Sequence, residues 1–172
     1  MKRLFCLAAL AAAALGPSLA AQAAGLEFAV GHTSESTMTY RLGLKSDWDK
    51  SWLQSDVGRL TGYWDGAYTY WEGDKSSASN SLSFSPVLVY EFAGESVKPY
   101  LEAGIGAALF SHTEVEGNRL GSAFQFEDRL GFGLRFAGGH EVGIRATHYS
   151  NAGISSRNDG VESYALHYTM PL

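Results

Sequence analysis

The sequence predicts an all-β protein, an eight-stranded antiparallel up-and-down transmembrane β-barrel. Three observations support this prediction. The N-terminus has the features of an export signal, the rest of the chain is rich in aromatic residues and glycine, and polar and apolar residues alternate along eight runs. Alternation at a period of two places one set of side chains on each face of a strand. Exported chains of this composition are typical of outer-membrane barrels.

Residues 1–23 are predicted to be a cleaved secretory signal peptide. Two basic residues precede an apolar stretch, residues 4–15, that is too short to span a bilayer as a helix. The segment Ala21-Gln22-Ala23 is a small-x-small cleavage site. Cleavage there leaves residues 24–172 as one barrel domain. Cys6 is lost with the signal, so the exported chain has no thiol for a disulfide or for nucleophilic catalysis.

Charge argues against nucleic acid as a partner. The chain carries a formal net charge of −5, and loss of the two cations of the signal makes it −7. No basic stripe is left that could neutralise phosphates. The exported part also lacks a run of about 18 apolar residues, which a membrane-spanning helix would need. Strands are therefore the predicted membrane-crossing elements.

In the first four predicted strands, most of the large apolar and aromatic side chains share one parity. These strands cover residues 26–33, 37–48, 59–71 and 80–92. A helix would need apolar residues at spacings of three and four, which these runs lack. The predicted outward set of the second to fourth strands is Met38, Tyr40, Leu42, Leu44, Trp48, Leu60, Trp64, Tyr68, Tyr70, Leu82, Phe84, Leu88, Tyr90 and Phe92.

The last four predicted strands cover residues 98–110, 120–136, 140–151 and 160–172. The final strand resembles the outer-membrane assembly signature, although that signature usually ends in Phe and this chain ends in Leu172. The outward set of the fifth strand and of the last strand is Leu101, Ala103, Ile105, Ala107, Leu109, Tyr164, Leu166, Tyr168, Met170 and Leu172.

A soluble eight-stranded barrel of the lipocalin kind is the alternative fold. It would place the apolar set inside and the charges outside. Export and aromatic content favour the opposite arrangement, in which charges pair within a small lumen. The predicted inward charges are Arg41, Glu91, Glu102, Glu127, Arg129, Arg135 and Arg145.

The connections support a membrane barrel with both ends in the periplasm. Residues 72–79 and 111–119 are long and polar and are expected outside the cell, whereas 93–97 and 137–139 are short and periplasmic. Residues 49–58 are the exception, because they are long for a periplasmic turn.

Three polar residues fall on the predicted lipid-facing surface near the external end. His148 and Ser150 share the outward face of the seventh strand, and Glu162 has the outward parity of the eighth. A symmetric hairpin between these strands places Glu162 opposite His148, with the Cβ atoms about 4.5–5.5 Å apart. Polar groups on a lipid face are costly unless they pair with one another, so this cluster needs a functional explanation.

The cluster suits acyl transfer. Ser150 would be the nucleophile, His148 the general base, and Glu162 the carboxylate that orients the imidazole. The side chain of Asn151 and the backbone amide of Gly153 are candidates for stabilising the oxyanion. The pattern His-x-Ser on a strand also occurs by chance. The catalytic interpretation therefore depends on the placement of these residues on a lipid face with a matching carboxylate.

Two further residues are candidates for contact with a substrate. Phe126 and Asp128 have outward parity on the sixth strand, next to the seventh. Phe126 either faces lipid or contacts an acyl chain. Asp128 either assists the site or is turned inward by a local bulge. No metal-ligand spacing and no cofactor motif is found, so neither a metal nor a cofactor is expected.

The chain resembles the PagL family of outer-membrane lipid A 3-O-deacylases. The resemblance covers essentially the whole exported part and rests on residues 148–153, 158–160, 162–164, 38–43, 48–52, 58–64, 89–94 and 126–129. It implies an eight-stranded barrel whose catalytic residues correspond to His148, Ser150 and Glu162. It also implies metal-free hydrolysis of the ester that holds the 3-position acyl chain of lipid A.

The expected partners are therefore lipid A as substrate and the surrounding outer-membrane lipid, with a homodimer kept as a candidate assembly. A non-catalytic barrel for adhesion or membrane integrity is the main alternative, and it would leave the three polar residues on the lipid face unexplained. A phospholipase or acyltransferase barrel would use similar chemistry on another acceptor.

Overall fold

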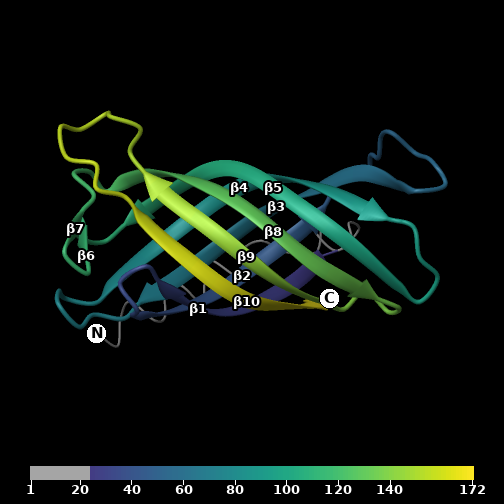
Figure 1. Cartoon of the computed structure of the whole chain (residues 1–172), viewed down its shortest axis with the longest axis horizontal. Helices are drawn as coiled ribbons and strands as arrows, with labels where there is room; N and C mark the ends of the chain where they lie inside the picture. The colour runs from purple at the N-terminus through teal and green to yellow at the C-terminus, as the bar shows by residue number, and fades with distance from the viewer. Residues whose placement is uncertain (1–23) are drawn as a thin grey trace.

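The computed structural model describes residues 24–172, and the predicted signal peptide lies outside the described residues. Eight long strands close an antiparallel barrel (Figure 1). They are β1 (Ala24–Thr33), β2 (Met38–Asp47), β3 (Gly58–Trp71), β4 (Ser79–Phe92), β5 (Val97–Phe110), β8 (Phe124–Phe136), β9 (Glu141–Ser150) and β10 (Val161–Pro171). A short hairpin outside the barrel sheet consists of β6 (Glu114–Val115) and β7 (Asn118–Arg119). No helix in this part of the chain is long and apolar enough to cross a membrane.

Each barrel strand pairs with the barrel strands before and after it along the chain, and β10 pairs with β1 to close the sheet. The closing pair runs in register from Gly25 opposite Pro171 to Thr33 opposite Ser163. Every predicted run corresponds to one of these strands. The predicted fold class, an eight-stranded antiparallel up-and-down barrel, is confirmed.

The largest departure from the prediction lies in the connection between β5 and β8. We predicted a strand from residue 120, but β8 begins only at Phe124, and the hairpin β6–β7 was not predicted at all. Leu120 is fully buried in a cluster with Val115 and Phe110. Alternation could not reveal this, because the parity of Leu120 fits an outward position in a strand, whereas its side chain packs in a buried cluster with residues from the ends of barrel strands.

The outer face of the barrel is apolar and the lumen is charged, as predicted. Leu44, Leu82 and Ile105 are more than half exposed, whereas buried ion pairs cross the lumen. Arg145 donates to Glu27 at 2.8 and 2.9 Å and to Glu102 at 2.6 Å. Buried charges are tolerated when they are paired and hydrogen-bonded. This sidedness excludes the lipocalin-like alternative, in which the apolar set would fill the interior.

Apolar side chains close the lumen beneath the external loops. Trp71, Phe110 and Tyr149 pack ring against ring, with centroids 5.2–5.4 Å apart. The Tyr149 hydroxyl donates to Glu127 at 2.8 Å, which joins this cluster to the ion pairs below. Figure 1 shows the β6–β7 hairpin and the connection from β9 to β10 at this end, and the C-terminus toward the other. Tyr149 of β9 and Val161 of β10 belong to this buried cluster, so both strands are anchored at the closed end.

The connection between β2 and β3 is ordered by contacts with the barrel. Trp52 and Leu60 exchange backbone hydrogen bonds of 2.7 and 2.8 Å, so the segment folds back along β3. The ring of Trp48 packs edge-on against Trp52 and Trp64. This connection, the exception among the predicted periplasmic turns, therefore carries an aromatic cluster on the outer surface.

Candidate active site

His148 and Glu162 form a hydrogen-bonded pair on the outer face of the barrel. They lie opposite each other in the β9–β10 register, as the hairpin symmetry predicted. The distance between His148 Nδ1 and Glu162 Oε1 is 2.9 Å. Their side chains are 44% and 39% exposed, so both can be reached from the membrane side. Because Nδ1 is engaged by the carboxylate, Nε2 is the ring nitrogen left to accept a proton.

Ser34 holds the second oxygen of the Glu162 carboxylate. Its hydroxyl donates to Oε2 at 3.1 Å from the turn between β1 and β2. Sequence reasoning missed Ser34, which is distant in the chain. The signal that could have found it is barrel closure, because the first strand of an eight-stranded barrel pairs with the last and thereby brings the first turn beside Glu162.

Ser150 is the last residue of β9 and points to the same side as His148. Residues two apart on a strand are about 6.7 Å apart along the chain, within reach of an imidazole and a hydroxymethyl group that lean toward each other. Ser150 is half-buried and lies opposite Phe126 on β8. The structure thus brings His148, Ser150 and Glu162 to one external corner formed by β8, β9 and β10.

Asn151 folds the connection after Ser150. Its side chain is fully buried, and its amide nitrogen donates to the carbonyl oxygens of Leu120 at 2.7 Å and Arg157 at 2.6 Å. Its amide oxygen accepts the backbone N–H of Gly153 at 2.9 Å. Both predicted oxyanion donors are therefore engaged inside the loop in this conformation. Their role toward an oxyanion stays a prediction and requires the loop to release at least one of these donors.

Gly160 ends the same connection beside the His148 ring. Its φ is +73°, a conformation that suits glycine. A Cβ at this position would lie 3.0 Å from His148 Cε1. Glycine therefore leaves room for the imidazole in its observed position.

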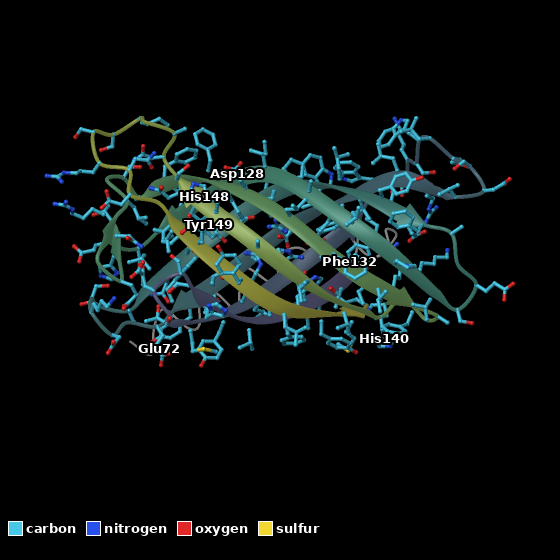
Figure 2. The ribbon with its side chains drawn as sticks, in the orientation of Figure 1. Glu72, Asp128, Phe132, His140, His148 and Tyr149 are labelled. Atoms are coloured by element: carbon cyan, nitrogen blue, oxygen red, sulfur yellow. The ribbon has the colours of Figure 1, made fainter. Side chains whose placement is uncertain are left out.

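Asp128 and Phe126 both lie on the outer surface, opposite His148 and Ser150 respectively. Asp128 is half-buried opposite His148 within continuous strand pairing, so no bulge turns it inward. Figure 2 shows Asp128 and His148 close together near the loop end of the barrel, with His140 at the far end. Phe126 packs edge-on against Phe124. A contact of either residue with a substrate stays a prediction.

An open cavity on the outer surface borders this corner. Its volume is about 1000 Å³, and His148, Glu162 and Asp128 line it together with apolar side chains of β4, β5 and β8. Within residues 24–172, no group of three or more His, Cys, Asp or Glu side chains is placed to hold a metal ion. The groups available for chemistry are thus a hydroxyl, an imidazole and a carboxylate beside an apolar groove, a set suited to hydrolysing an ester of a lipid.

Comparison with known sequences agrees with this chemistry. A family model described as Lipid A 3-O-deacylase (PagL) matches residues 37–171. Lipid A deacylase PagL of Pseudomonas aeruginosa is 60% identical over 173 residues, which cover all of both chains. Lipid A deacylase PagL of Bordetella bronchiseptica is 38% identical over 105 residues, which cover 60% of this chain and 58% of that protein.

Comparison with solved structures gives the same result. The crystal structure of the outer membrane enzyme PagL matches with a TM-score of 0.83 and 61% identity, covering 86% of this chain and 99% of that chain. A de novo designed transmembrane β-barrel matches with a TM-score of 0.53 and 13% identity, covering 88% of this chain and 96% of that chain, which supports the fold alone. With its barrel, its lipid-facing site and these relatives, the chain belongs to the PagL family of lipid A 3-O-deacylases.

Proposed function

We propose that this protein hydrolyses the ester of the 3-position acyl chain of lipid A, with Ser150 as nucleophile, His148 as general base and Glu162 as the orienting carboxylate. The hydrogen-bonded His148–Glu162 pair beside Ser150, on the lipid-facing side of an outer-membrane barrel, carries this proposal. Family membership favours it over a non-catalytic barrel, which would give these polar groups no role.

The chemistry follows from the positions of the three side chains. Nε2 of His148 takes the proton of Ser150 while Oγ attacks the ester carbonyl, and Glu162 stabilises the imidazolium that forms. The tetrahedral intermediate collapses, and the 3-oxygen of the sugar leaves with the proton from His148. Water, deprotonated by the same histidine, then attacks the acyl-serine. The products are the free fatty acid and regenerated Ser150.

Lipid A reaches this site laterally from the outer leaflet. His148, Ser150 and Glu162 have outward parity, and the lumen is filled by ion pairs and aromatic rings. A substrate path through the barrel is therefore excluded by packing. All three residues belong to one chain, so a homodimer, which stays a candidate assembly, is not needed to complete the site. The proposal includes removal of residues 1–23 on export.

Mass spectrometry of lipid A tests the proposal. Cells that express the protein should lose one 3-hydroxyacyl chain from lipid A, and fragmentation should place the loss at the 3-position. The Ser150→Ala variant should leave lipid A unchanged while reaching the outer membrane in equal amount. Ser77→Ala, in the exposed connection between β3 and β4, is the matched control and should behave as wild type. Lipid A that loses the chain equally with Ser150→Ala would refute the assigned nucleophile.

A further inference from the structure

One row of outward side chains runs from the catalytic corner across the barrel wall. Glu162 lies opposite His148, and His148 lies opposite Asp128. Asp128 in turn lies opposite Ile105 on β5. On β4 the row reaches Pro86, where the paired register between β4 and β5 is interrupted, because proline has no N–H to donate.

A second row lies one step closer to the periplasmic end. Along it, Tyr164 pairs with Ala146, Ala146 with Leu130, and Leu130 with Ala103. Ala103 pairs with Leu88 on β4. Both rows line the cavity of about 1000 Å³ that borders the catalytic corner. Two members of the second row are alanines, so the surface between the rows is a groove and not a ridge.

Aromatic rings close the far end of this groove. Beyond Leu88 the second row reaches Gly62, which has no side chain. The ring of Trp48 occupies that space, since a Cβ on Gly62 would lie 2.3 Å from it. Trp64, opposite Pro86 in the first row, packs against Trp48 with ring centroids 5.7 Å apart. A chain lying in the groove therefore meets Trp48 after crossing β4.

The groove descends into the membrane as it leaves the site. His148 is near the external end of β9, whereas Trp48 directly follows the periplasmic end of β2. Strands of such barrels tilt by about 35–45°, so a row that crosses them also changes depth. An acyl chain whose sugar lies at the outer-leaflet surface must take this direction. Direction, apolar lining and contact with His148 together fit the chain that is being cleaved.

The length of the groove can be derived from strand spacing. Three spacings of about 4.8 Å separate β9 from β4, which gives about 14 Å. An extended hydrocarbon advances about 1.25 Å per carbon, from a bond length of about 1.5 Å and a bond angle of about 111°. The groove therefore holds roughly eleven carbons before the chain reaches Trp48.

We propose that this groove binds the acyl chain to be cleaved and that Trp48, at its closed end, sets the longest chain that the enzyme cleaves efficiently. This inference rests on the proposed deacylase function and extends it to chain-length preference. Chains that fit bury all their methylenes against β4, β5 and β8, whereas the ends of longer chains are displaced by the Trp48 ring. Each methylene that stays outside the groove forfeits its share of apolar burial.

The test measures fatty-acid release from 3-O-acyl glucosamine esters in phosphatidylcholine vesicles, with acyl chains graded on both sides of roughly eleven carbons. Ala103→Phe places a ring in the groove on β5, two strand spacings from β9, and should shorten the accepted chain to roughly eight carbons. Trp48→Ala opens the far end and should raise the relative rate on longer chains. Val30→Phe, on the outer face of β1 and outside this groove, is the matched control for added bulk.

For Ala103→Phe we expect the rate on longer esters, taken relative to the rate of the same variant on the shortest ester, to fall roughly tenfold once two or more methylenes no longer fit. A length profile of Ala103→Phe that matches that of Val30→Phe would overturn the inference, even if Trp48→Ala fails to fold. Deacylation of the shortest ester that depends on Ser150 would still support the proposed function in that case. Failure of the function itself has a separate signature, namely no Ser150-dependent release from any ester.

Discussion

Replacement of Glu162 tests how the carboxylate contributes to catalysis. The Nδ1–Oε1 distance of 2.9 Å is typical of a charge-assisted hydrogen bond, and such bonds contribute about 1.5–3 kcal/mol. Both side chains are more than a third exposed, so solvent weakens the interaction and we take the lower part of this range, about 1.5–2 kcal/mol. At about 1.4 kcal/mol per factor of ten, Glu162→Ala should lower kcat by roughly 10–30-fold.

Steady-state hydrolysis of purified lipid A in mixed micelles separates this effect on kcat from an effect on KM. Glu162→Gln keeps an oxygen acceptor for Nδ1–H and should be affected less than Glu162→Ala. Ser34→Ala removes only the hydrogen bond to the second carboxylate oxygen of Glu162 and should lower kcat a few-fold. The effect is small because this hydrogen bond is exposed to solvent and its donor is an uncharged hydroxyl. A Glu162→Ala enzyme with a kcat within twofold of wild type would show that this carboxylate does not assist His148.

Three further predictions concern the support of the site. Arg145→Ala should lower the free energy of unfolding in lipid vesicles by about 3–5 kcal/mol, measured by urea titration. The substitution leaves the buried carboxylates of Glu27 and Glu102 without this cationic partner in the lumen. Gly160→Ala should reduce kcat more than it reduces stability, because the added methyl meets the His148 ring; equal kcat would contradict this. Burial raises the pKa of Glu116, but the backbone N–H groups of Asp74 and Lys75 donate to its carboxylate and hold the pKa below its ordinary 4.5. These two hydrogen bonds tether the β6–β7 hairpin to the β3–β4 connection, and the tether should be intact at neutral pH. It should loosen as the pH falls through the depressed pKa, and the hydrogen-exchange protection of those two amides should fall at neutral pH in Glu116→Gln.

The strand pattern could be predicted from the sequence because a period of two is set by backbone geometry alone. The same geometry, with a symmetric hairpin, located Glu162 opposite His148. Parity also placed Phe126 and Asp128 on the outward face, with an inward-turning bulge as the open alternative for Asp128. These inferences succeed because they concern residues within one strand or across one hairpin, where the register follows from counting.

Contacts between distant segments could not be predicted in this way. Ser34 reaches Glu162 only because the barrel closes, and Trp48 covers Gly62 only because the β2–β3 connection folds back on β3. Alternation reports which face a side chain occupies and carries no information on which loop folds against it. For the same reason, alternation could not predict that the Asn151 side-chain amide donates to the carbonyl oxygens of Leu120 and Arg157.

Covalent labelling of Ser150 tests the central claim most directly. A fluorophosphonate with a hydrocarbon tail, added to the protein in outer-membrane vesicles, should modify Ser150, as located by peptide mass spectrometry. Labelling should be slowed strongly in His148→Ala, because the hydroxyl then lacks its base, and should be absent in Ser150→Ala. Labelling of another residue, or equal labelling in His148→Ala, would contradict a serine nucleophile activated by the His148–Glu162 pair.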